Sequence, residues 1–207
     1  MTLLSALDFL SVFIFGLSGA LAASRAQLDL VGFLFIASLT AVGGGTLRDV
    51  FLNRDLIFWI ANPWYIATAC AAAIIVFFTA HLLESRRTAL DWLDAGAFAI
   101  AVAAGAGVAW SLGYGPAVVL IMSMVTGAMG GLMRDVVCNE VPLVLRQGEL
   151  YLSAAFAGAL TALIVDEFTG PHPATLIACA GVTFLLRAGS LTFGWRLPVY
   201  KSRPPKS

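Results

Sequence analysis

Seven apolar runs dominate the sequence, and each is close to the roughly 20 residues that a helix needs to cross a lipid bilayer. They are Leu7–Ala23, Leu30–Phe51, Trp64–Leu83, Leu93–Leu112, Pro116–Cys138, Leu150–Val165 and Ala174–Gly194. Of the 207 residues 60% are apolar and 12% charged, so no polar stretch is long enough for a soluble domain. The sequence therefore predicts an all-α integral membrane protein with seven transmembrane helices, forming a single transmembrane domain over residues 1–207.

The charge balance and the cysteine and histidine content argue against several function classes. Twelve basic and twelve acidic side chains cancel, which argues against a nucleic-acid partner. Cys70, Cys138 and Cys179 lack a CxxC spacing, and the chain has two histidines, so neither a metal site nor a cofactor is predicted. No nucleophile–base pair lies near the motifs described below, so the sequence does not predict an enzyme.

The two halves of the chain resemble each other at a fixed offset of 86 positions, the distance from Arg48 to Arg134. The motif GGGTLRD, which ends at Asp49, recurs at this offset as MGGLMRD, which ends at Asp135. Further identical pairs at the same offset are Leu7 and Leu93, Asp8 and Asp94, Gly19 and Gly105, Thr40 and Thr126, and Tyr65 and Tyr151. We predict a duplication, with repeat one over about 7–83, repeat two over about 93–167 and an extra helix over about 174–194. Because each repeat contains three spans, the second starts on the opposite side of the membrane, which makes an inverted 3+3 repeat.

The distribution of basic residues predicts the orientation in the membrane. The face that carries the N-terminus holds Arg48 and Arg54. The opposite face holds Arg25, Arg86, Arg87, Arg134, Arg146, Arg196, Lys201, Arg203 and Lys206. The positive-inside rule then places the N-terminus outside and the C-terminus in the cytoplasm. The polar tail Lys201–Ser207 is predicted to be disordered.

The glycine clusters of the second and fifth runs are candidate hinges in a polar route. The candidate hinge residues are Gly43, Gly44, Gly45, Gly130 and Gly131. Both clusters begin about 14 residues into their runs, roughly 21 Å at 1.5 Å per residue and past the middle of a ~30 Å hydrocarbon core. A break there would expose backbone carbonyls that water or a cation can satisfy. We predict that the two breaks frame a narrow lumen, and the alternative is that the glycines only allow neighbouring helices to pack closely.

Each glycine cluster is followed by a charged pair, Arg48–Asp49 in the first and Arg134–Asp135 in the second. We interpret these residues as pore-mouth charges or a gate, the alternative being a snorkelling arginine beside a solvated carboxylate. Adjacent residues of a helix do not face each other, so no ion pair within each dipeptide is assumed. An unpaired arginine would repel cations, so a cation path requires a carboxylate from another helix, or an arginine that moves as a gate.

Several other polar residues lie in or beside the apolar runs. Candidate pore-lining hydroxyls are Ser38, Thr40, Ser123 and Thr126; alternatively these bond to their own helix. Asp8 and Asp94 stand near the start of their runs and are interpreted as helix caps. Arg187 lies inside the seventh run, which makes it either a functional charge or a snorkelling one.

With these motifs, the chain resembles bacterial members of the trimeric intracellular cation channel family over nearly its whole length. The resemblance implies a homotrimer in the bacterial cytoplasmic membrane, surrounded by membrane lipids. Each protomer would have its own potassium-permeable pore, lined by kinked second and fifth helices, with potassium as the permeant ion and no cofactor. The kinks of the family would match Gly43–Gly45 and Gly130–Gly131 here. The basic residue that follows each kink in the family would match Arg48 and Arg134.

The same features leave a second function open, because related bacterial sequences are also labelled as glycine transporters. Inverted repeats with broken helices are common in secondary transporters, where a helix N-terminus faces an anionic group of the solute. In a transporter of a small solute such as glycine, the motif arginine would bind the carboxylate.

Overall fold

The computed structural model describes residues 2–83, 85–169 and 173–200. Within these residues the chain forms eight α-helices and two short 3-10 helices. The α-helices are α1 (Leu3–Arg25), α2 (Leu30–Phe51), α3 (Phe58–Ala61), α4 (Trp64–Thr79), α5 (Arg86–Ser111), α6 (Pro116–Val137), α7 (Leu152–Thr169) and α8 (Pro173–Phe193), and the 3-10 helices are η1 (Ala80–Leu82) and η2 (Leu143–Leu145). The predicted disordered tail Lys201–Ser207 lies outside the described residues.

The prediction of an all-α membrane protein is confirmed. Six helical segments of the described chain are long and apolar enough to cross a membrane: α1, α2, α4 with η1, α5, α6 and α8. The helix α7, which the sequence predicts as the sixth of seven spans, has 18 residues and is not among these six. The count of seven spans therefore stays a prediction.

Local sequence explains where the helices begin. The side chains of Thr2, Asp29 and Ser85 accept hydrogen bonds from backbone amides at the N-termini of α1, α2 and α5. The helix α6 instead begins with Pro116, whose missing amide hydrogen costs nothing at that position.

The helices α2 and α6 end in the same way. Asn53 and Asn139 follow them with φ of 50° and 54°, in the left-handed conformation that asparagine tolerates better than most residues. These two asparagines occupy equivalent positions of the sequence repeat.

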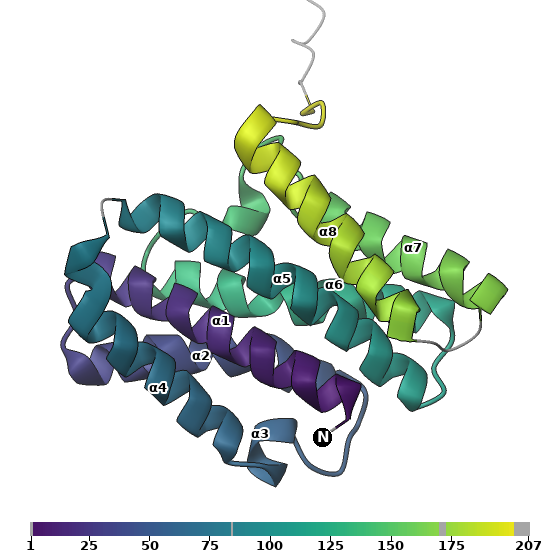
Figure 1. Ribbon diagram of the computed structural model, residues 1–207, viewed down its shortest axis with the longest axis horizontal. Coiled ribbons are helices and arrows are strands. Elements are labelled where there is room, and N and C mark those ends of the chain that lie inside the picture. The colour runs from purple at the N-terminus through teal and green to yellow at the C-terminus, as the bar shows by residue number, and fades with distance from the viewer. Residues whose placement is uncertain (1, 84, 170–172, 201–207) are drawn as a thin grey trace, which may run out of the picture.

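The helices α1 and α5 form the centre of the bundle and run antiparallel (Figure 1). The start of α1 lies against the end of α5, where a Cβ on Gly107 would meet Leu4. At the other end, Arg86 Nη1 donates to the carbonyl oxygen of Ser24 at 3.4 Å. Both helices are rich in alanine and glycine, and they have the largest buried shares among the candidate spans, 56% and 78%. Small side chains let helix backbones approach closely, as in other membrane helix bundles.

The helices α7 and α8 pack together beside this centre (Figure 1). Gly158 of α7 lies so close to α8 that an added Cβ would overlap the side chain of Thr183 and crowd the carbonyl oxygen of Cys179. Gly158 therefore serves close packing of α7 on α8 within the protomer.

Ion pairs connect the ends of three helices at one end of the bundle. Glu140, just after α6, pairs with Arg25 of α1 at 3.1 Å and with Arg87 of α5 at 2.8 Å. Arg87 also pairs with Asp91 one turn further along α5, at 3.3 Å.

Candidate functional site

The helices α2 and α6 cross at the glycines of the repeated motif. A Cβ on Gly44 would overlap the backbone carbonyl oxygen of Thr126, and a Cβ on Gly130 would overlap that of Thr40. The two contacts are reciprocal and join equivalent positions of the repeat. Only glycine fits at such a close approach between two backbones.

The predicted break of the helix backbone at Gly43–Gly45 and Gly130–Gly131 is wrong. Both α2 and α6 are α-helical from end to end, through all five glycines. The physical reason is packing: the glycines lie against neighbouring helices, and the uninterrupted helix keeps its own backbone hydrogen bonds satisfied. The close-packing alternative therefore describes the backbone here, while the role of these glycines in a pore stays a prediction.

The candidate lining hydroxyls are directed mostly to their own helices. Thr40 donates to the carbonyl oxygen of Ile36, and Thr126 to that of Met122, both at 2.6 Å. Ser123 bonds in the same way within α6 at 2.7 Å. Ser38 lies 4.0 Å from the sulfur of Cys70 in α4. Such bonds satisfy the hydroxyl hydrogen and leave the oxygen lone pairs free to accept.

A first cluster of charged residues, made of Asp8, Arg48, Asp49 and Arg54, lies where the end of α2 meets the start of α1. The buried guanidinium of Arg48 donates through Nη1 to Asp8 Oδ1 at 3.0 Å and through Nε to Asp49 Oδ1 at 2.8 Å. Arg54 also pairs with Asp49, at 3.2 Å. The second oxygen of Asp49 accepts the amide of Phe58 at 2.8 Å, which positions the start of α3.

A second cluster, made of Asp94, Arg134 and Asp135, repeats this geometry at the end of α6. Arg134 donates through Nη1 to Asp94 Oδ1 at 2.9 Å and through Nε to Asp135 Oδ1 at 2.8 Å. The second oxygen of Asp135 accepts the amide of Leu143 at 2.8 Å, at the start of η2. Two further groups contact this cluster: Arg134 donates to the hydroxyl of Ser18, and Tyr151 donates to Asp94 Oδ2 at 3.0 Å.

These clusters correct two expectations. Asp8 and Asp94 are not helix caps, because α1 and α5 begin earlier, at Leu3 and Arg86, so both carboxylates lie inside their helices. The two residues of each Arg–Asp dipeptide do form an ion pair, because the long arginine side chain bends back to its neighbour.

Sequence reasoning thus missed the cross-helix partners of the arginines, although one signal was available. Asp8 and Asp94 are acidic residues near the start of apolar runs, and they are related by the repeat offset. Burying a charge in lipid requires a partner of opposite sign, and each repeat supplies one such carboxylate for its arginine.

The first cluster borders a solvent-open hollow at the end of the bundle that holds the N-terminus. This hollow, hereafter the vestibule, has a volume of about 330 Å³ and is lined by Asp8, Arg54, Asn62, Tyr65 and Ser111 among others. Asp8 also borders a small inner cavity of about 10 Å³ that reaches the crossing of α2 and α6. That volume is near the minimum for one water molecule.

The small inner cavity is bordered both by the first cluster and by the helix crossing. Its walls include Thr40, Gly44 and Thr126 besides Asp8. Asp8 therefore borders both the vestibule and the inner cavity, so the first cluster lies next to the contact between the two motif helices.

The second cluster is less exposed to solvent than the first. The side chains of Arg134 and Asp94 are 0% exposed, whereas that of Asp8 in the first cluster is 13% exposed. Arg187 of α8, also buried, lies over the ring of Tyr151 with its guanidinium carbon 4.6 Å from the ring centre, and pairs with Glu149 at 3.4 Å. Arg187 therefore connects α8 to the second cluster through Tyr151 and does not snorkel to the surface.

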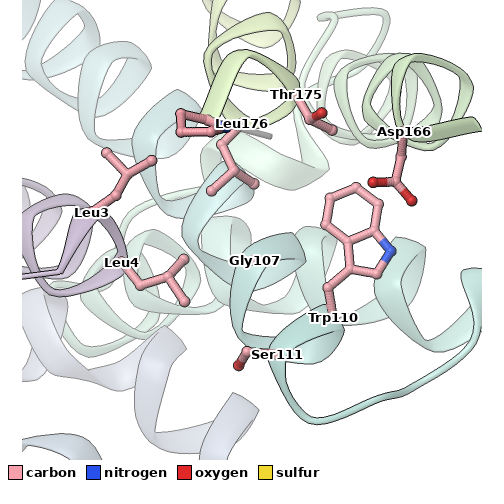
Figure 2. A pocket seen from close by; sticks show the side chains of 9 residues that line it. Leu3, Leu4, Gly107, Trp110, Ser111, Asp166, Thr175 and Leu176 are labelled. Atoms are coloured by element: carbon pink, nitrogen blue, oxygen red, sulfur yellow. The ribbon is translucent and has the colours of Figure 1, made fainter. Parts of the chain in front are cut away.

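A separate pocket of about 260 Å³ is enclosed by the start of α1, the end of α5, α7 and the start of α8 (Figure 2). Its walls are mainly apolar: Leu3, Leu4, Leu176 and Trp110, with Asp166 at one side. None of the motif residues lines it. Its mainly apolar lining does not suit a route for ions.

The described residues offer no protein ligands for a metal centre. Within 2–83, 85–169 and 173–200, no three His, Cys, Asp or Glu side chains come together in a metal-binding arrangement. The three cysteines remain separate thiols.

The chain is similar in sequence to a known family and to membrane proteins of other bacteria. A family model described as Glycine transporter matches the chain twice, over residues 5–81 and 91–167, with the same offset as the sequence repeat. The inner membrane protein YadS of Escherichia coli K12 is 31% identical over 199 residues, which cover 94% of each chain. A membrane protein of Deinococcus radiodurans, also described as UPF0126, is 35% identical, covering 93% of this chain and 90% of its own length.

Solved structures with the same fold include a trimeric intracellular cation channel orthologue from Rhodobacter sphaeroides. That structure is 38% identical and superimposes with a TM-score of 0.90, covering 94% of this chain and 100% of the other. A prokaryotic channel of the same name, crystallised in 0.5 M KCl, is 26% identical with a TM-score of 0.86, covering 94% and 98%.

Proposed function

Because the chain belongs to the trimeric intracellular cation channel family, with 38% identity to the Rhodobacter sphaeroides orthologue, we propose that it is a channel for monovalent cations, with potassium as the permeant ion. The pore lies within each protomer and is lined by α2 and α6. Its path runs from the vestibule past the first cluster, through the crossing of the two motif helices, and past the second cluster to the opposite face.

The observation that carries this proposal is the neutralisation of both motif arginines. An uncompensated arginine beside the path would repel cations, but Arg48 and Arg134 each lie between two carboxylates, one of them from a neighbouring helix. The first cluster combines two carboxylates with two guanidinium groups, and the second combines two carboxylates with one. Neither cluster presents a net positive charge to a passing cation.

The crossing of α2 and α6 is the proposed constriction. Gly43, Gly44, Gly45, Gly130 and Gly131 are the proposed hinge positions, because residues without a side chain let two helices shift past each other with the least steric cost. Thr40 and Thr126, with Ser38 and Ser123, are the proposed lining, since their oxygen lone pairs can replace part of an ion's hydration shell. Arg48, Asp49, Arg134 and Asp135 are the proposed pore-mouth charges.

The finer features of the assembly belong to the same proposal. We place seven spans in the membrane, with α7 as the sixth and an inverted 3+3 repeat, which the antiparallel packing of α1 on α5 supports. The names of the relatives support a bacterial inner membrane and a homotrimer. The charge bias of the loops supports an external N-terminus and a cytoplasmic C-terminus.

A planar-bilayer recording of the purified protein in asymmetric KCl tests the function. We expect unitary current steps whose reversal potential has the sign of the potassium equilibrium potential. A reversal potential of chloride sign, or no current from folded protein, would overturn the proposal. Arg48→Ala and Arg134→Ala should change open probability or conductance, and wild-type currents from both would remove the pore-mouth role.

One observation favours a second candidate, a secondary transporter of a small solute such as glycine. Within the described residues, the Nη2 atoms of Arg48 and Arg134 are buried without a hydrogen-bond partner. A guanidinium nitrogen of this kind can donate to the carboxylate of a solute. Saturable glycine uptake into liposomes, without unitary currents in the absence of glycine, would establish the transporter in place of the channel.

A further inference from the structure

Two adjoining pockets form an apolar groove along α1, α5 and α8. The first is the pocket of about 260 Å³ in Figure 2, and the second has a volume of about 430 Å³. Leu3 of α1 and Leu176 of α8 line both pockets. The walls of the second pocket carry no charged side chain, and Ile100 and Phe184 are among them. Both pockets together are called the groove below.

The groove is about as deep as one leaflet of a membrane. Its walls run from Gly107 to Gly96 in α5 and from Pro173 to Phe184 in α8, 11 residues in each helix, which is roughly 16 Å at 1.5 Å per residue. Half of a ~30 Å hydrocarbon core is about 15 Å. A Cβ on Gly96 or Gly181 would meet nothing within 4 Å, so side chains do not fill this part of the groove. The inner part therefore has the length, the lining and the open space that suit an acyl chain.

The outer part of the groove carries one charge among the described residues that line it, the carboxylate of Asp166. This half-buried residue lies in the last turn of α7, which ends at Thr169, and the dipole of a helix disfavours an acidic side chain at that end. None of the ion pairs between described residues involves Asp166. A bound cation would compensate both the carboxylate and the helix end.

Two further groups in the outer part suit a ligand with an ammonium group. Trp110 of α5 and Asp166 of α7 lie on the same side of the pocket, across from Leu3 and Leu4 (Figure 2). The face of an indole ring attracts cations, and tryptophan favours the boundary between lipid and water. Thr175 is 2% exposed, and its hydroxyl has no hydrogen-bond partner among the described residues. A buried hydroxyl of this kind is usually satisfied by a bound water or ligand.

We propose that the groove binds one membrane phospholipid whose headgroup carries an ammonium group. The ammonium lies at Asp166 and Trp110, and one acyl chain lies along α5 and α8. No basic side chain is among the described residues that line the groove, so charge complementarity favours this headgroup over one whose only charge is the phosphate. Leu4 and Ser111 also line the vestibule, so the lipid would lie next to it. The inference goes beyond the proposed channel function and does not depend on it.

Native mass spectrometry of the full chain in detergent tests the headgroup. The probes are phosphatidylethanolamine and phosphatidylglycerol with identical acyl chains, of which only the first has an ammonium group. We expect one phosphatidylethanolamine per protomer, bound roughly tenfold more tightly than phosphatidylglycerol, as the added charge-assisted contact implies. Asp166→Asn should abolish this preference. Glu167→Gln removes the adjacent carboxylate, which does not line the groove, and should keep the preference.

A second variant tests the acyl chain. Gly181→Leu places a side chain in the open part of the groove, so the protein should fold as the wild type does. Both lipids should bind this variant more weakly by a similar factor, because each loses apolar contact with α8. Competition with free ethanolamine distinguishes a lipid from a soluble amine, and we expect no displacement of the phospholipid at equal concentration.

Equal binding of the two lipids by the wild type, or an unchanged preference in folded Asp166→Asn protein, would overturn the inference. Displacement by free ethanolamine at equal concentration would also overturn it, because the occupant would then be a soluble amine. If Asp166→Asn and Gly181→Leu instead separated the protomers without changing lipid binding, a second copy of the chain would cover the groove in place of a lipid. None of these measurements uses ion current, so a failure of the channel proposal would leave them unaffected.

Discussion

Replacing Gly44 by alanine should separate α2 from α6, and the structure sets the size of the effect. The added methyl group would overlap the carbonyl oxygen of Thr126, a backbone atom that cannot rotate away. Restoring an ordinary contact distance requires a local shift of roughly an ångström between the two helices. Overpacking of this kind costs about 1–3 kcal/mol.

A matched control removes the effect of helix propensity. Alanine is favoured over glycine inside a helix by about 1 kcal/mol, so every Gly→Ala change includes this gain. Gly96 of α5 has open space around the position of a Cβ, with nothing within 4 Å. The stability difference between Gly44→Ala and Gly96→Ala therefore isolates the overpacking at the crossing.

Thermal unfolding in detergent, followed by tryptophan fluorescence at one scan rate, measures this difference. For a chain of this size, about 2 kcal/mol corresponds to a Tm difference of roughly 4–8 °C, with Gly44→Ala the less stable variant. Equal Tm values would refute the packing argument. If Gly44→Ala also kept wild-type stability but changed conductance, Gly44 would affect the pore without being required for helix packing.

Three further outcomes are expected. Arg134→Ala should lower the free energy of unfolding by about 3–5 kcal/mol, because it leaves two buried carboxylates without their cation. Arg48→Ala should lower it less, because Asp8 is partly exposed and Arg54 still pairs with Asp49. Chemical denaturation measures both losses, and equal losses would contradict the difference between the clusters. Glu140→Gln removes two partly exposed ion pairs, so the loss in the free energy of unfolding should stay below about 1 kcal/mol. The loss should be smaller in 1 M salt, which Tm values at low and high salt would reveal. Gly158→Ala should loosen α7 from α8 by overlap with the side chain of Thr183, and faster proteolysis at the ends of α7 would report it, whereas unchanged cleavage would count against that contact.

The helices could be predicted from the sequence because run length and hydropathy determine them. The bounds of α2 match the apolar run Leu30–Phe51, where Asp29 supplies the cap. The helix α5 starts two turns earlier than its apolar run, at Arg86, because Ser85 caps it and its first turns are amphipathic. This early start is what turns Asp94 from an expected cap into a buried partner.

Whether the glycine clusters break their helices or pack against a neighbouring helix could not be predicted from the sequence alone. A glycine-rich stretch fits a break and a close contact equally well, and the outcome depends on which atoms lie opposite. Those atoms are the carbonyl oxygens of Thr40 and Thr126, contributed by the other motif helix. The identical offset of the two threonines and the two glycine clusters indicated that they act together, but not how.

The sequence indicates what a cation path past the motif arginines requires, but not which residues meet that requirement. Because an unpaired arginine repels cations, the sequence predicts that a cation path requires either a carboxylate from another helix or an arginine that moves as a gate. Which carboxylate pairs with each arginine depends on the rotation of each helix about its own axis. This rotation is determined by the packing of the whole bundle.

The spacing of the ion pairs has a consequence for how the protein is made. Each arginine finds its cross-helix carboxylate 40 positions earlier, within its own three-helix half. During synthesis the first half can therefore enter the bilayer with its charge already compensated, before the second half has left the ribosome. The glycine contacts between α2 and α6 need both halves, so we expect docking of one finished half onto the other to be the final step of folding.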